Sequence, residues 1–123
     1  MNEILVVDDE PDIRQVIEDI LRDEGFTVLA ATNGRNMLKL LETVTPSLIL
    51  LDVMMPDMNG IDAFQVMQRS SKLKDIPVVM MSAGFKFTDM KDVLHGWLPK
   101  PFDLEHLLEL VWGIVGRRTT SEG

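Results

Sequence analysis

The sequence predicts one α/β domain, with a five-stranded parallel sheet and helices on both faces of that sheet. Wholly apolar runs, such as residues 4–7 and 48–51, alternate with segments whose apolar residues recur at helical spacing. Runs without polar alternation are typical of strands covered on both faces, and right-handed crossovers between parallel strands place helices on both sides. The length of 123 residues fits a single domain.

Each element follows from a local signal in the chain. The first strand, residues 4–7, ends at two aspartates, and Pro11 can start a helix because its missing N–H is not needed there. Gly25 is a typical residue to end that helix. The other strands are predicted at residues 26–31, 48–51, 77–81 and 97–99, and the other helices at residues 37–44, 61–67 and 104–115. Residues 117–123 are expected to be a flexible polar tail, which leaves a domain of residues 1–116.

The composition excludes several functional classes. The chain has 20 acidic and 12 basic side chains, a formal net charge of −8 and no cysteine. An acid excess repels phosphates, so we expect no direct binding of nucleic acid and no attraction to anionic lipid. Without cysteine there is no disulfide, thiolate metal site or cysteine nucleophile. No apolar stretch approaches the ~20 residues that span a bilayer, and we expect a soluble, cytoplasmic protein.

Polar residues follow four of the predicted strands. Asp8 and Asp9 follow the first strand, Asp52 the third, Ser82 the fourth and Lys100 the fifth. Functional groups of open parallel sheets gather outside the carboxyl ends of the strands. Several carboxylates on one edge repel one another unless a cation is present, and hard oxygen ligands suit Mg²⁺. Because a carboxylate can attack phosphorus, the pattern indicates Mg²⁺-dependent phosphoryl transfer.

Four segments resemble the CheY-like receiver domain of two-component response regulators. They read ILVVDDEPDIRQVI, LILLDVMMPDMNGIDAF, PVVMMSA and LPKPF, and each lies at its own predicted strand. A single acidic doublet would be weak support, but the ordered set is specific. The resemblance extends from about residue 4 to about residue 115. It implies a flavodoxin-like, doubly wound sheet with strand order 2-1-3-4-5 and phosphorylation-controlled signalling as the function.

The resemblance implies a role for each acidic residue. Asp52 would accept a phosphoryl group from the phosphohistidine of a sensor histidine kinase or a phosphotransfer protein. Mg²⁺ would be bound by Asp52, directly by Asp9, and by Asp8 mostly through a water molecule. The backbone carbonyl of Met54 would complete the protein ligands. Read from the residues alone, the acidic doublet could also be a solvated helix start, where acids are favoured by the helix dipole.

The same resemblance implies a switch and an output. Lys100 would contact the phosphoryl oxygens and would precede a cis peptide bond at Pro101. Ser82 would move toward the acyl phosphate, and the ring of Trp97 would reorient behind it. A tryptophan at this place is more often simply packed, and the family usually has Tyr or Phe there. The signal would pass to a downstream protein target or effector.

Between Ser82 and Lys100 the chain departs from the family pattern. This stretch is shorter than usual by about one helical turn, on the order of four residues. We therefore expect the fourth helix, within residues 88–94, to be short or disordered. We also expect phosphorylation to order or move residues 83–96, where Phe85 and Phe87 would serve a partner contact. A homodimer through residues 83–96 or through the last helix is a further expectation.

Two other functions compete with the receiver. One is a Mg²⁺-dependent phosphatase or phosphotransferase with an aspartyl nucleophile, but Met54 stands where such enzymes usually place a general acid. The other is a degenerate receiver that serves as a binding scaffold, against which the complete set of acids and Lys100 argues. We expect a non-enzyme that catalyses only its own phosphorylation and dephosphorylation. The sequence fits both a stand-alone receiver and one cut from a longer protein.

Overall fold

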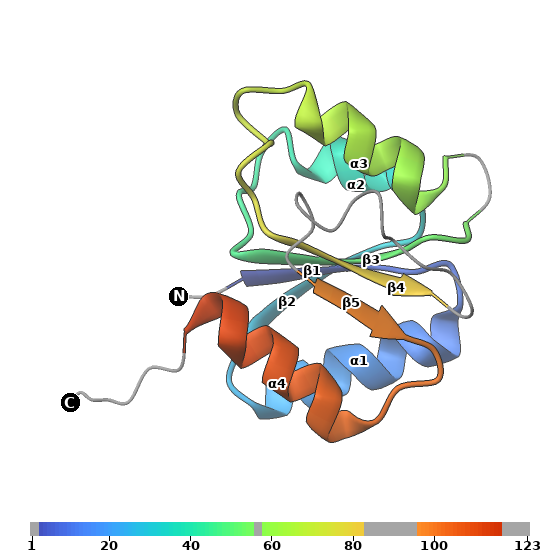
Figure 1. Cartoon of the computed structure of the whole chain (residues 1–123), viewed down its shortest axis with the longest axis vertical. Helices are drawn as coiled ribbons and strands as arrows, with labels where there is room; N and C mark the ends of the chain where they lie inside the picture. Colours follow the sequence, from blue (N-terminus) through green and yellow to red (C-terminus); the bar gives the residue numbers. More distant parts are fainter. Residues whose placement is uncertain (1–2, 56–57, 83–95, 117–123) are drawn as a thin grey trace.

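One parallel sheet with helices on both faces forms the domain (Figure 1). The computed structural model describes residues 3–55, 58–82 and 96–116. The five strands have the order β2-β1-β3-β4-β5, which confirms the predicted topology. The elements, in chain order, are β1 (Glu3–Val7), α1 (Pro11–Asp23), β2 (Thr27–Ala31), α2 (Gly34–Leu40), β3 (Leu48–Asp52), α3 (Gly60–Gln68), β4 (Val78–Ser82), β5 (Gly96–Pro99) and α4 (Leu104–Val115).

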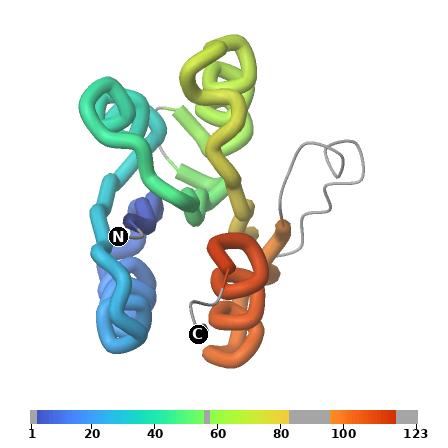
Figure 2. Tube along the Cα trace, turned by 90° about the vertical axis from the view of Figure 1, so that its left-hand side faces the viewer, coloured from blue at the N-terminus to red at the C-terminus, as the bar shows by residue number. Residues whose placement is uncertain are grey.

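The helices form two layers, one on each side of the sheet. Helices α2 and α3 cover one face, and α1 and α4 cover the other (Figures 1 and 2). Successive side chains of a strand point to opposite faces, so β1 sends Leu5 and Val7 into the core under α2 and α3. Ile4 and Val6 enter the second core, which α1 and α4 cover. Two buried faces explain why Ile4–Val7 of β1 and Leu48–Leu51 of β3 are apolar without interruption.

The helix starts follow the usual capping rules, and two of the signals, Pro11 and Gly25, are the predicted ones. Pro11 is the first residue of α1. Asn33, Asn59 and Asp103 each accept, through the side chain, a backbone N–H three residues further on, at the starts of α2, α3 and α4. Gly25 follows α1 with a φ of 97°, a conformation that side chains other than glycine rarely adopt. These local signals fix where the four helices begin and where α1 ends.

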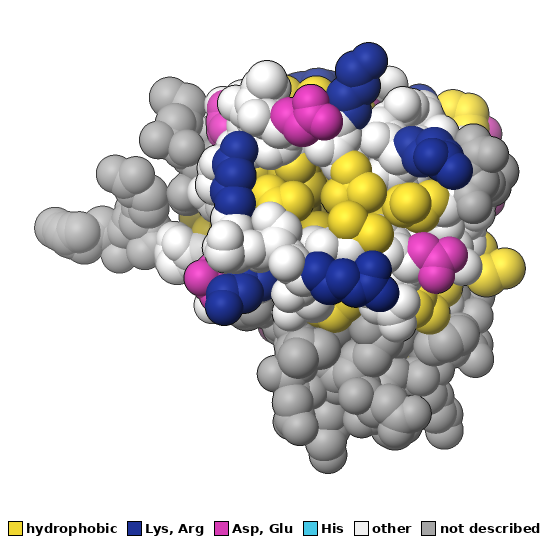
Figure 3. Space-filling model, turned by 90° about the horizontal axis from the view of Figure 1, so that it is seen from above, with side chains coloured by type: hydrophobic (Ala, Val, Ile, Leu, Met, Phe, Trp, Pro, Cys, Tyr) yellow, Lys and Arg dark blue, Asp and Glu magenta, His cyan; other side chains and the backbone are white. Residues whose placement is uncertain are grey.

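Helix α2 is shorter than the apolar pattern predicts. It ends at Leu40, whereas the pattern extends to Val44. The reason is a tightened end: the N–H of Glu42 bonds to the carbonyl of Lys39, and that of Thr43 to Leu40, each three residues back. Figure 3 shows hydrophobic side chains at the surface of the layer of α2 and α3, bordered by lysines and arginines.

Some predicted features involve residues outside those that the structure describes. The predicted fourth helix within residues 88–94, the partner contact through Phe85 and Phe87, and the tail at residues 117–123 all lie outside the described residues. Within the described ranges, no helix combines the length and apolar character that crossing a membrane requires.

Gly60 brings α3 against the end of β3. A Cβ atom at this position would collide with the backbone carbonyl oxygen of Asp52 and lie 3.0 Å from its carbonyl carbon. The N–H of Gly60 also donates to the carbonyl of Val53 at 2.9 Å. Only glycine therefore allows α3 to begin so close to the strand that carries Asp52.

We predict that Gly60→Ala lowers the free energy of unfolding by about 1–3 kcal/mol, because backbone at the strand end must move to admit the methyl group. The control is Gly113→Ala in α4, where an added Cβ meets no atom within 4 Å. That change should stabilise the protein by about 0.5–1 kcal/mol through helix propensity. Urea denaturation measures both effects. Equal stability of Gly60→Ala and wild type would show that the collision is relieved without strain.

Candidate functional site

Two aspartates lie side by side where the central strands end. The register of β1 and β3 pairs Val7 with Leu51, so the next residues, Asp8 and Asp52, follow together at the carboxyl edge. Asp8 is fully buried and Asp52 is 3% exposed. The N–H of Asp8 donates to the carbonyl of Ala31, and the carbonyl of Asp8 accepts a hydrogen bond from Arg14 at 2.8 Å. The backbone thus places two carboxylates in one buried position.

Lys100 joins these carboxylates from the other side. The backbone N–H of Lys100 donates to the carbonyl of Ser82 at 2.9 Å. This hydrogen bond fixes the position of Lys100 just after β5. The Lys100 Nζ lies 2.9 Å from Asp8 Oδ2 and 3.4 Å from Asp52 Oδ1. The Lys100–Pro101 peptide bond is cis, in agreement with the resemblance. The predicted gathering of Asp8, Asp52 and Lys100 on one edge is therefore what the structure contains.

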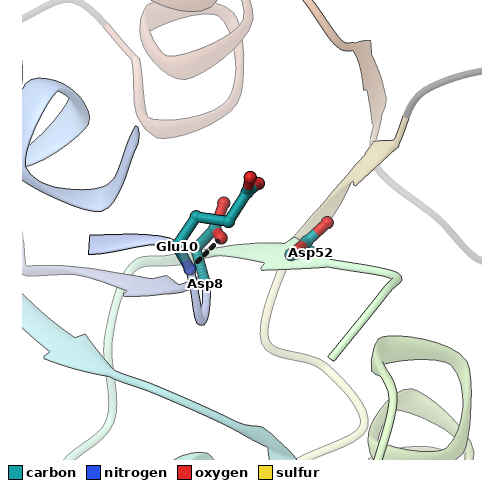
Figure 4. A group of neighbouring side chains, drawn as sticks. All are labelled: Asp8, Glu10 and Asp52. Carbon is teal, nitrogen blue, oxygen red and sulfur yellow. Dashed lines mark hydrogen bonds between the residues drawn. The ribbon is translucent and has the colours of Figure 1, made fainter. Parts of the chain in front are cut away.

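A third carboxylate, from Glu10, completes the cluster. Oxygens of Asp8, Glu10 and Asp52 lie within 4.8 Å of one another, a group that could hold a metal ion (Figure 4). The backbone N–H of Glu10 donates to Asp8 Oδ1 at 2.9 Å, and its carboxylate lies 3.2 Å from the Lys100 Nζ. Asp9, expected from the resemblance as a direct metal ligand, is half-buried and is not in this group.

Sequence reasoning missed Glu10. It treated the first two acids of the Asp8-Asp9-Glu10 run as the ligands and gave the third no role. The available signal was the run of three acids before Pro11. Any of the three could face the site, and a short loop directs only some of its side chains there. Glu10 lies at the N-cap of α1 with an extended backbone. Which acids face the site depends on this turn, not on their order.

Burial and charge shift the pKa of both central groups. Desolvation, followed by the negative charge of Asp8, raises the pKa of Asp52 to about 6, although Lys100 acts against this. Burial alone would lower the pKa of the Lys100 ammonium. The hydrogen bond to Asp8 and the charges of Asp52 and Asp8 outweigh burial, so the pKa of Lys100 is raised. The site therefore favours protonation of the Asp52 carboxylate and keeps the neighbouring Lys100 ammonium charged.

The remaining predicted residues occupy the same edge or its border. Ser82 ends β4 and is 2% exposed, one residue beyond the Met81 that pairs with Asp52. The backbone of Met54 donates a hydrogen bond to the Asp52 carboxylate, while the Met54 side chain is 72% exposed. Trp97 lies on β5 opposite Met80 and is 37% exposed, so it is not a fully packed core residue.

Comparison with known proteins identifies the family. The family model of the response regulator receiver domain matches residues 4–112. The chain is a response regulator receiver domain. Receiver domains act in phosphorylation-dependent signalling. This one has the predicted fold, and its acidic cluster contains two of the three predicted acids, Asp8 and Asp52, with Glu10 in place of Asp9.

This receiver domain is similar to parts of longer regulators. It is 35% identical to the transcriptional regulatory protein CpxR of Escherichia coli K12, over 99% of this chain and 53% of CpxR. It is 36% identical to the DNA-binding response regulator MtrA of Mycolicibacterium smegmatis, over 88% of this chain and 48% of MtrA. The receiver domain therefore spans about half the length of these relatives.

Solved structures show the same likeness in three dimensions. The chemotaxis response regulator CheY4 of Vibrio cholerae superposes with a TM-score of 0.85 at 32% identity, covering 93% of this chain and 98% of CheY4. The receiver domain of the sensor histidine kinase PA1611 of Pseudomonas aeruginosa gives 0.84 at 25% identity, covering 94% and 98%. That structure has a magnesium ion coordinated in its active site cleft.

We predict that Asp52→Asn stabilises the metal-free protein at pH 8, by about 1–3 kcal/mol, because the amide removes a buried charge. The pKa of Asp52 is about 6 in the folded state against 3.8 ordinarily, so the folded state binds the proton more tightly. The wild-type penalty is therefore present above pH 6 and fades as the pH falls through 6 toward 4, and the gain of the variant fades with it.

Urea denaturation in EDTA at pH 8 and at pH 4.5 measures this difference. Asp75→Asn serves as the control, because Asp75 is an exposed acid outside the site. If Asp52→Asn is no more stable than Asp75→Asn at pH 8, the ionised Asp52 is not strained in the folded protein.

Proposed function

We propose that Asp52 is the phospho-acceptor of this receiver domain, and that Lys100 and Ser82 assist the transfer. The observation that carries the proposal is the shared ammonium: the Lys100 Nζ lies within 3.4 Å of carboxylate oxygens from both Asp8 and Asp52. An ammonium at this point can neutralise the charge that develops on a transferred phosphoryl group. Ser82, at the end of the neighbouring strand, is placed to offer a hydroxyl on the same edge.

The donor set at this edge fits Mg²⁺. Asp8 and Asp52 supply buried carboxylate oxygens, and neither Cys nor His takes part in the group. Hard oxygen donors of this kind are the ligands that Mg²⁺ prefers. Bound Mg²⁺ would neutralise charge on the phosphoryl oxygens. We include Asp9 and the carbonyl of Met54 in the proposed ligand set, since Asp9 directly follows Asp8 and Met54 lies two residues after Asp52 in the chain.

In the proposed transfer, an Asp52 carboxylate oxygen attacks the phosphorus of a phosphohistidine on a sensor histidine kinase or phosphotransfer protein. The new P–O bond makes an acyl phosphate, and the P–N bond breaks with its electron pair left on the imidazole nitrogen. Lys100 remains protonated throughout and offers N–H donors to the phosphoryl oxygens. The raised pKa of Lys100 keeps it charged for this role.

A hollow beside the site supports a protein as the donor. It has a volume of about 290 Å³ and is lined mainly by apolar groups of α1 and of the segment after β5. Val16, which is 54% exposed, and Lys100 both line it. An apolar hollow that ends at the reactive ammonium fits a protein that docks on α1 while it presents its phosphohistidine. We assign the kinase or phosphotransfer protein to this surface.

The output belongs to the same proposal. We assign the switch to Ser82 and Trp97, because one ends β4 and the other lies on the neighbouring β5. A signal that reaches β5 can pass to a downstream protein through the exposed indole. We also propose residues 1–116 as the domain, which the end of α4 at Val115 and the family match to residue 112 support.

Acetyl phosphate with Mg²⁺ tests the acceptor. Intact mass spectrometry should find one added phosphoryl group on the wild-type chain, with acetate as the leaving group. Asp52→Asn should take up none, whereas Asp75→Asn should react like wild type. Addition that survives in Asp52→Asn would show that another residue is the acceptor. Absence of addition to the wild type would contradict phosphorylation itself.

Val16→Glu tests the docking surface. We predict at least tenfold slower phosphotransfer from a histidine kinase that phosphorylates the wild type, because a charge would enter the apolar contact. The rate with acetyl phosphate should stay within twofold of wild type. Val66→Glu on α3, where the side chain is 36% exposed, is the matched control and should leave both rates unchanged. Equal kinase rates for the two variants would place docking elsewhere.

A further inference from the structure

Glu10 lies at the solvent-exposed side of the site, and its side chain forms an ion pair with Lys100. It is the N-cap residue of α1, yet its side chain makes no capping hydrogen bond. The carboxylate instead accepts a hydrogen bond at 3.2 Å from the Lys100 ammonium, a residue 90 positions away. The Glu10 side chain is therefore oriented by its contact with Lys100 and not by capping of α1.

With Glu10 in place, three carboxylates surround the Lys100 ammonium, and two of them, those of Asp8 and Glu10, accept hydrogen bonds from it. A lysine ammonium has three N–H groups. Oxygens of Asp8, Glu10 and Asp52 lie 2.9, 3.2 and 3.4 Å from its nitrogen. A phosphoryl group on Asp52 brings further strong acceptor oxygens to the same ammonium. Lys100 can turn more than one donor to them only if a carboxylate releases it.

The three carboxylates differ in how easily they can be released. The Asp8 side chain is fully buried and that of Asp52 is 4% exposed, so an unpaired charge on either would be strongly unfavourable. The Glu10 side chain is 57% exposed. Water can replace its ion pair at little loss, because exposed ion pairs contribute little to stability. Among these three, Glu10 is the partner that Lys100 can exchange.

We propose that Glu10 is a positioning residue that holds Lys100 before the reaction and is exchanged for a phosphoryl oxygen when Asp52 reacts. This inference rests on the proposed function of Asp52. While Glu10 holds Lys100, it competes with the incoming phosphoryl group for the ammonium. Glu10 thereby slows phosphorylation, and its removal leaves Lys100 with a free donor from the start.

The test compares rates of phosphorylation by acetyl phosphate at saturating Mg²⁺, followed by intact mass. We expect Glu10→Gln to react about two- to tenfold faster than wild type, which is the range that one exposed charge at this distance can supply. Glu42→Gln, an exposed acid two residues after the end of α2, should react like wild type. In a Lys100→Gln background, Glu10→Gln should have no effect, because the ammonium through which it acts is gone. Thermal unfolding of each variant checks that it is folded.

The outcomes separate this inference from the proposed function. If the wild type takes up no phosphoryl group, the proposed function fails, and the role of Glu10 fails with it. If the wild type is phosphorylated and Glu10→Gln reacts at the wild-type rate, the proposed function stands and the inference is wrong. The inference is also wrong if Glu10→Gln accelerates the reaction equally in the Lys100→Gln background, since Glu10 would then act only as a negative charge on the donor's approach.

Discussion

The rest of the site depends on one ammonium that neutralises two buried carboxylates. Asp8 follows β1 and Asp52 ends the neighbouring β3. Both are almost inaccessible to solvent, so their mutual repulsion is barely screened by water. Lys100 reaches both from the end of the last strand. Without this third group, the two ionised acids could not share the edge at neutral pH. The position of Lys100 after β5 is thus as important as the acids themselves.

The sheet explains why these groups lie where they do. Both faces of the central strands are buried, so charged side chains stand only at the ends of β1 and β3 and not in their interiors. At the carboxyl ends, the helices turn away and the chain can place polar groups beside one another. Gly60 adds a steric condition, because α3 must begin against the carbonyl of Asp52. The packing that buries the strands also confines the chemistry to this edge.

Much of this arrangement could be predicted from the sequence, because strand ends are visible in it. Asp8, Asp52 and Lys100 each follow an apolar run, and parallel topology then brings them together. Two features were not visible. The end of α2 at Leu40 is set by a tightened turn that leaves the apolar pattern unchanged. The contact of Glu10 with Lys100 joins residues 90 positions apart, and the backbone direction at the start of α1 decides it.

The charge of the site explains why it needs both a cation and a releasable acid. Three carboxylates and one ammonium leave two negative charges at the edge, which a divalent cation could balance. Phosphorylation then adds negative charge to Asp52, beyond what the buried groups can neutralise. Asp8 cannot leave, because its side chain is fixed by the backbone of Glu10 and by Lys100. An exposed acid that can turn into solvent is the part of the cluster able to adapt to that added charge.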